Sequence, residues 1–206
     1  MYIGHKMNYL FIDIETTGLP DFTGLKFGCF PDYTDLRKYN NSRIVQISFM
    51  LCNEKFETIE MYNYIIKNNG FEIINSSLHN ITNDIALTQG VPLIDVCNIL
   101  NECLEKSSHI IAHNISFDVN VLLSELYRLK MVSLIKIIQS KIQFCSMNYT
   151  TPILKLRKIF GNHKPPKLDE LYFYVFKTPM ENSHNSNYDV INLHKIMKVL
   201  FKDKKL

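Results

Sequence analysis

The sequence predicts an α/β fold in which helices flank a central mixed sheet of five strands. Three segments rich in β-branched and aromatic residues come first, and the connections between them favour antiparallel neighbours. From Pro92 onward, apolar residues recur at helical spacing, and these segments alternate with short apolar runs. Three strands followed by alternating helices and strands are typical of one mixed sheet covered by helices.

The strands are expected where apolar, β-branched and aromatic residues cluster between turn-forming residues. The fourth is the short buried run HIIAHN, and the fifth is KIQFCS, for which a helix stays open as an alternative. A long loop containing five aromatic residues joins the first two strands. The expected ranges are 9–14, 43–52, 57–66, 109–114 and 141–146.

Helices are expected where apolar residues recur three or four positions apart. The first runs from Pro92 to a Lys-Ser-Ser break, and the second places Asp118 in its first turn. The last three candidates are separated by two polar loops. The expected ranges are 92–106, 117–129, 151–161, 167–176 and 188–201.

The length and composition suit a single domain spanning residues 1–206. The chain of 206 residues is 46% apolar and 21% charged, which is ordinary for a globular protein with a full hydrophobic core. It contains no apolar run near 18 residues, and residues 1–8 lack the order of a signal peptide. We therefore expect an intracellular, soluble protein with no membrane partner.

The five cysteines form no CxxC pair and are odd in number, so they are expected to be reduced and mostly buried. The charges are distributed unevenly: residues 1–135 hold 10 Lys and Arg against 15 Asp and Glu, whereas residues 136–206 hold 13 against 5. A basic C-terminal part beside an acidic N-terminal part is suited to bind a polyanion that must approach a carboxylate cluster. A solvated lysine-rich surface explains the same distribution.

Two carboxylates stand close together in the first strand, in the run LFIDIETTGLP. Asp13 and Glu15 are two positions apart, so both side chains project from the same face of the strand. Their repulsion would raise the pKa of one of them unless a cation lay between them. The pair therefore indicates a divalent metal ion or a shared proton.

Two further acids stand at the ends of other segments, where an α/β sheet presents its site. Asp118 follows the fourth strand and Asp189 begins the last helix. Carboxylates gathered in this way bind hard cations such as Mg²⁺ or Mn²⁺ through oxygen. His184 lies in the polar loop ENSHNSNYD and is suited to take a proton from an attacking water, although an ordinary surface histidine is the alternative.

Three short motifs, FIDIETTG, HNISFD and HNSNYD, resemble those of the DEDDh 3′-to-5′ exonucleases. This family includes epsilon-like proofreading subunits, RNase T and oligoribonuclease, and the resemblance implies a ribonuclease H-like fold. The third motif has the H-x4-D spacing of the histidine branch, and Tyr188 is not at the tyrosine-branch position. LHNITNDIALTQG and PKLDELYFYVF are also similar to family segments, so the likeness covers about residues 8–200.

The resemblance implies two metal ions, Mg²⁺ or Mn²⁺, held by Asp13, Glu15, Asp118 and Asp189, with His184 as general base. It also implies contacts to the substrate. Thr16, Thr17 and Gly18 would turn the backbone toward the terminal nucleotide, and Leu19 would press on its base. Asn114, Phe117 and His79 would also contact the substrate, while a core role for Phe117 and a structural role for His79 stay open.

The chain departs from the family pattern in an insertion at about residues 21–42. This insertion is expected to be a surface loop, and its aromatic residues could instead stack on bases or contact a partner.

The expected function is removal of nucleotides from a 3′ end, with DNA favoured over RNA. The alternatives are RNA trimming, a catalytically weak nucleic-acid-binding accessory module, and an endonuclease of similar fold. A polymerase or a replication or repair complex is the expected protein partner.

Overall fold

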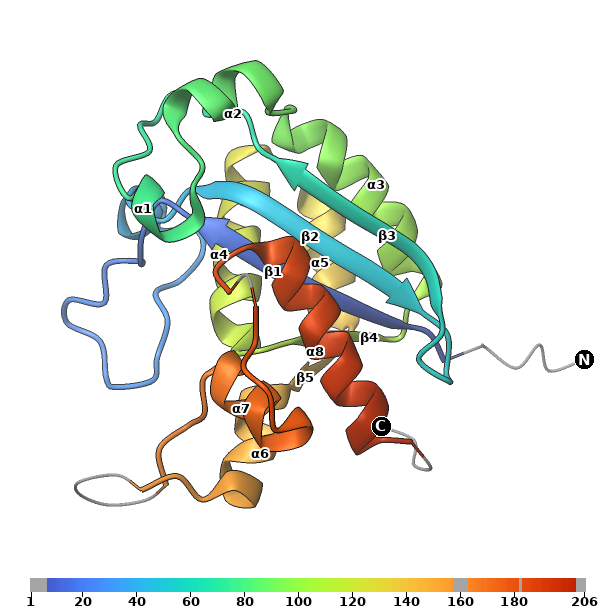
Figure 1. Cartoon of the computed structure of the whole chain (residues 1–206). Coiled ribbons are helices and arrows are strands. Elements are labelled where there is room, and N and C mark those ends of the chain that lie inside the picture. Colours follow the sequence, from blue (N-terminus) through green and yellow to red (C-terminus); the bar gives the residue numbers. More distant parts are fainter. Residues whose placement is uncertain (1–6, 158–162, 182, 203–206) are drawn as a thin grey trace, which may run out of the picture.

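In the part of the chain that the computed structural model describes, residues 7–157, 163–181 and 183–202, five strands form one sheet in the order β3-β2-β1-β4-β5 (Figure 1). The β1 strand pairs antiparallel with β2, and β2 pairs antiparallel with β3, whereas β4 and β5 continue the sheet in parallel. The predicted mixed sheet is confirmed. The strands are β1 (Tyr9–Thr16), β2 (Ile44–Cys52), β3 (Thr58–Ile65), β4 (His109–Ala112) and β5 (Ile142–Cys145).

Four of the predicted helices are confirmed: α3 (Leu93–Lys106), α4 (Ile115–Arg128), α7 (Leu168–Phe176) and α8 (Ser186–Leu200). The sequence analysis missed α5 (Val132–Ser140), although its buried Leu134, Ile135 and Ile138 have helical spacing. It also missed the short elements η1 (Leu36–Tyr39), α1 (Ser76–His79) and α2 (Asn83–Gln89). Among the described helices, none has the length and apolar character needed to span a membrane.

The helix predicted over 151–161 is wrong in its bounds. The α6 helix (Ser146–Leu154) begins directly after β5 and ends where Lys155 adopts a left-handed conformation, with φ 50°. The hydroxyl groups of Thr150 and Thr151 donate hydrogen bonds to the Ser146 and Met147 carbonyls one turn earlier, so these polar side chains find acceptors inside the helix. Residues 158–161 of the predicted helix lie outside the described residues.

The two faces of the sheet pack against different helices, which are visible on opposite sides of β1 in Figure 1. Leu10 and Ile12 of β1 belong to the core shared with α3, α4 and α5. Tyr9 and Phe11 belong to a second core, shared with α8. Because side chains alternate along a strand, Asp13 and Glu15 continue the face that α8 covers.

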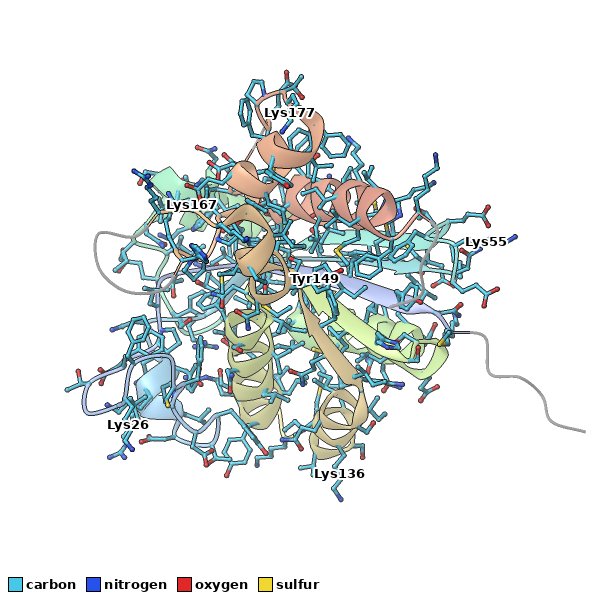
Figure 2. The ribbon with its side chains drawn as sticks, turned by 90° about the horizontal axis from the view of Figure 1, so that it is seen from below. Lys26, Lys55, Lys136, Tyr149, Lys167 and Lys177 are labelled. Carbon is cyan, nitrogen blue, oxygen red and sulfur yellow. The ribbon has the colours of Figure 1, made fainter. Side chains whose placement is uncertain are left out.

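Residues 21–42 form a loop that leaves the end of β1 and returns to β2 (Figure 1). Near its base, Lys38 contacts Asp21 at 2.8 Å, and the buried Tyr39 donates a hydrogen bond from its hydroxyl group to the Pro31 carbonyl. Lys26 projects outward from the distal part of the loop (Figure 2). Tyr39 therefore has a structural role, while residues 21–29 are exposed.

Candidate active site

Three carboxylates converge where β1 ends beside the start of α8. Asp13, Glu15 and Asp189 each place one carboxylate oxygen within 4.8 Å of the others. Asp118 lies in the first turn of α4, where its buried Oδ1 accepts a hydrogen bond of 3.2 Å from the main-chain N–H of Ile14. The structure thus brings the four predicted acids together from three separate elements.

The electrostatics of this cluster are unfavourable in the absence of a cation. Burial and the charges of Asp118, Asp189 and Glu15 raise the pKa of Asp13 well above its usual value. Burial and the charge of Asp189 raise the pKa of Glu15 to about 7. Burial also raises the pKa of Asp189 to about 7, with a further contribution from the charge of Asp169.

The donor set fits a hard divalent cation. It consists of carboxylate oxygens, which are the ligands that Mg²⁺ and Mn²⁺ prefer. Among the described residues, the buried Oδ1 atom of Asp189 has no hydrogen-bond partner. A cation would supply a partner for this oxygen and would cancel the repulsion between the carboxylates.

Polar side chains of β2 hold the start of α8 in place. Gln46 accepts a hydrogen bond of 3.3 Å from the N–H of Ser186, and the hydroxyl groups of Ser48 and Ser186 are 2.7 Å apart. Asn185 caps the helix by accepting from the N–H of Asn187. Sequence reasoning missed this support, although two polar residues inside the apolar run RIVQISFMLC were a signal.

His184 lies next to the cluster, on the exposed loop that precedes α8. Its main-chain N–H donates a hydrogen bond of 3.2 Å to Oδ2 of Asp189. The residue adopts a left-handed conformation, with φ 65°, which is uncommon for a residue with a side chain. The loop is therefore fastened to a carboxylate of the cluster.

The turn after β1 is held by contacts within the chain. The Thr17 N–H donates to the Arg43 carbonyl at 2.9 Å, and the Thr17 hydroxyl group donates to the Asn41 carbonyl at 3.0 Å. The Thr16 hydroxyl group donates to the Gly18 carbonyl. At Gly18, a Cβ would lie 2.8 Å from the Asn41 carbonyl oxygen, so the glycine is required by this close approach.

Leu19 and His79 differ sharply in exposure. The Leu19 side chain is 66% exposed beside the turn. His79 is buried, which lowers its pKa, and its Nδ1 accepts a hydrogen bond from the Ile81 N–H. Its Nε2 lies 3.4 Å from Asn75, whose amide donates to the Thr16 carbonyl. His79 therefore has a structural role and is linked through Asn75 to the turn.

Asn114 and Phe117 flank the start of α4. Asn114 is the N-cap residue, with φ 67°, and Phe117 is partly buried against the core. Sequence reasoning missed the neighbouring His113, whose Nδ1 and Nε2 lie 2.9 Å from the Ser146 hydroxyl group and the Pro166 carbonyl. This histidine joins the end of β4 to α6 and to the segment before α7.

Comparisons with known proteins show the family of this chain. The exonuclease (RNase_T) family model matches residues 10–197. The DNA polymerase III subunit epsilon of Buchnera aphidicola subsp. Schizaphis graminum (strain Sg) is 31% identical over 183 residues, which are 88% of this chain and 67% of that protein.

Solved structures of exonuclease I share the fold. The E. coli ExoI–ssDNA complex in its zinc-bound form superimposes with a TM-score of 0.71 at 17% identity, over 96% of this chain and 41% of that one. Exonuclease I from Methylocaldum szegediense gives a TM-score of 0.68 at 17% identity, over 96% and 41% of the two chains. The chain thus spans about two fifths of the exonuclease I proteins that it matches.

The sheet is that of the ribonuclease H-like fold, and the family match defines a nuclease. The chain belongs to the exonuclease family, in its DEDDh class. The motif resemblance seen in the sequence is confirmed.

Proposed function

We propose that this chain is a metal-dependent exonuclease that removes nucleotides from the 3′ end of DNA. The convergence of Asp13, Glu15 and Asp189, with oxygens within 4.8 Å of one another, is the observation that carries the proposal. The raised pKa values of these groups support it, because a cluster that is strained without a cation is suited to bind one.

Asp13, Glu15, Asp118 and Asp189 would hold two divalent ions, Mg²⁺ or Mn²⁺. Bound there, these ions would lower the pKa of the attacking water and stabilise charge on the leaving 3′ oxygen. Asp118 contributes a carboxylate whose orientation is fixed by the Ile14 N–H. Asp189 contributes an oxygen that lacks any other partner among the described residues.

His184 would act as the general base that removes a proton from the attacking water. Its N–H bond to Asp189 keeps the loop at the edge of the cluster, and the exposure of the residue leaves the imidazole accessible to water and substrate. The turn of Thr16, Thr17 and Gly18 would receive the terminal nucleotide, with the exposed Leu19 against its base. Asn114 and the partly buried Phe117 complete the proposed substrate contacts, whereas the buried His79 would support the turn through Asn75.

The choice of DNA is supported by the relatives. One is named as a subunit of a DNA polymerase, and one solved structure is described as a complex with single-stranded DNA. Association with a polymerase is a further part of the proposal and rests on the first of these names. RNA remains the competing substrate because recognition of RNA depends on contacts to the 2′ hydroxyl group.

The deciding experiment is a gel time course with purified protein, Mg²⁺ or Mn²⁺, and two 5′-labelled single strands of one sequence, DNA and RNA. A ladder that shortens from the 3′ end, faster on DNA and absent for Asp189→Ala, is expected. Faster shortening of the RNA strand than of the DNA strand would identify RNA, and not DNA, as the substrate. Internal cuts, or no cleavage by a folded metal-loaded protein, would contradict the proposal.

A further inference from the structure

A cavity of about 570 Å³ lies on the face of the sheet opposite the carboxylate cluster. It is enclosed by the first residues of β2, the segment after β3, and parts of α2, α3 and α4. Ile44, in its wall, belongs to the core shared with α3 and α4, whereas Asp13 and Glu15 face α8. The cavity is therefore separate from the candidate active site.

The charged groups of this cavity are predominantly positive. Among the described lining residues, Arg43, Lys67 and Arg128 are cationic, and Glu125 is the carboxylate that faces them. Arg43 donates hydrogen bonds to both carboxylate oxygens of Glu125, from Nε at 2.5 Å and from Nη2 at 3.2 Å. The guanidinium group of Arg128 lies 4.0 Å from the same carboxylate and so shares a partner that is already engaged.

Two buried polar atoms at this cavity have no hydrogen-bond partner among the described residues, the Nε–H of Arg128 and the Oδ1 of Asn68. Burial and the neighbouring charge of Arg43 lower the pKa of Arg128. Nη2 of Arg128 donates to the Leu36 carbonyl at 2.9 Å and to Oδ1 of Asn40 at 3.1 Å, which are neutral acceptors. The charge of Arg128 is therefore only partly offset by Glu125, and an anion in the cavity would neutralise it further.

The rest of the wall is apolar and includes an aromatic ring. Phe71 lies beneath the guanidinium group of Arg43, 4.4 Å from its ring centroid. Leu87 and Ile94 are about half exposed along the same wall, which leaves apolar surface for a flat ring to cover. Cavities of roughly 300 to 1,000 Å³ with such mixed walls are typical of small-molecule sites.

We propose that this cavity binds a phosphate-bearing anion of nucleotide size. The phosphate group lies among Arg43, Arg128 and Lys67, and the base lies along the apolar wall at Phe71. The Arg43 carbonyl accepts a hydrogen bond from the Thr17 N–H, and the Arg43 N–H donates one to the Thr17 hydroxyl group, so the site adjoins the turn after β1. The proposal depends on this cavity and not on the proposed function.

The test is isothermal titration calorimetry of the full chain in excess EDTA with three probes: inorganic phosphate, thymidine 5′-monophosphate and thymidine. Without a cation, the carboxylate cluster repels phosphate, so binding in EDTA reports the cavity. The nucleotide is expected to bind, inorganic phosphate to bind more weakly, and thymidine to give no heat. Asp13→Asn should leave the nucleotide titration unchanged.

Variants assign the binding to named residues. Lys67 is exposed, so Lys67→Gln should keep the fold while weakening both phosphate ligands by about three- to tenfold, and Arg128→Gln should weaken them by about tenfold or more. Phe71→Leu should weaken the nucleotide and spare inorganic phosphate. Lys55→Gln is the matched control, because Lys55 lies in the exposed turn at the other end of β2 and β3 (Figure 2).

Three results would overturn the proposal. One is the absence of heat with phosphate and nucleotide at millimolar concentrations. The other is nucleotide binding that Lys67→Gln and Arg128→Gln leave unchanged while thermal unfolding shows that both variants are folded. Nucleotide binding that Asp13→Asn strengthens would likewise assign the nucleotide to the carboxylate cluster and exclude the cavity, because the substitution removes one of the charges that repel phosphate there.

Discussion

The main-chain N–H of His184 donates a hydrogen bond to Oδ2 of Asp189, at 3.2 Å, across five positions of the chain. This bond joins the loop of the proposed general base to the proposed metal ligand at the start of α8. The imidazole itself makes no part of the bond, so removing the side chain leaves the anchor intact. Catalysis and folding are therefore separable at this residue.

His184→Ala should lower the rate of 3′-end hydrolysis by about 10² to 10⁴, the usual contribution of a general base. Thermal unfolding should be nearly unchanged because His184 is exposed. His163→Ala is the control, since His163 is an exposed histidine on the loop before α7. Single-turnover rates at saturating metal give the measurement, and an unchanged rate for His184→Ala would remove this residue from the mechanism.

Asp189→Asn should abolish metal-dependent cleavage while stabilising the metal-free protein. The substitution removes one of the charges that raise the pKa values of Asp13 and Glu15, so repulsion in the empty cluster decreases. Thermal unfolding in EDTA should give a higher Tm than the parent chain. Added Mn²⁺ should raise the parent Tm and have little effect on the variant, and an equal rise in both would mean that Asp189 does not hold the ion.

The metal-free protein should lose stability as pH rises from about 4.5 to about 7. Glu15 and Asp189 have pKa values of about 7 in the folded state, above their ordinary values of 4.5 and 3.8, so the folded state binds more protons than the unfolded state in this range. Each such proton contributes a slope of up to about 1.4 kcal/mol per pH unit.

Urea unfolding in EDTA across this pH range measures the slope, and saturating Mn²⁺ should flatten or reverse it. Because protons compete with the ion for the same carboxylates, Mn²⁺ should also bind more tightly at pH 8 than at pH 6. A free energy of unfolding that does not change with pH in EDTA would contradict the raised pKa values of Glu15 and Asp189.

Gly18→Ala should destabilise the fold by about 1 to 3 kcal/mol, because the new Cβ would lie 2.8 Å from the Asn41 carbonyl oxygen. Gly24→Ala is the control: its φ of 82° also disfavours a side chain, but nothing lies within 4 Å of a Cβ there. Its cost should be about 1 kcal/mol. Chemical denaturation compares the two, and equal losses would mean that the contact with Asn41 relaxes without cost.

Much of the fold and the candidate site was predictable because the relevant signals are local. Strand alternation places Asp13 and Glu15 on one face, and helical spacing identifies the element that begins near Asp189. The bounds of α6 were not predictable in this way, because the hydroxyl groups of Thr150 and Thr151 bond to carbonyls of their own helix, and threonine side chains make such local bonds in turns as well.

The sequence by itself determined which residues are the candidates for the chemistry, since the motifs name the acids and the histidine by spacing along the chain. Only the tertiary structure decided how they meet. Asp118 reaches the Ile14 N–H across 104 positions, and Gln46 holds the Ser186 N–H across 140. Such contacts depend on how β1, β2, α4 and α8 pack, and packing between distant segments leaves no periodic signal in the residues that make it.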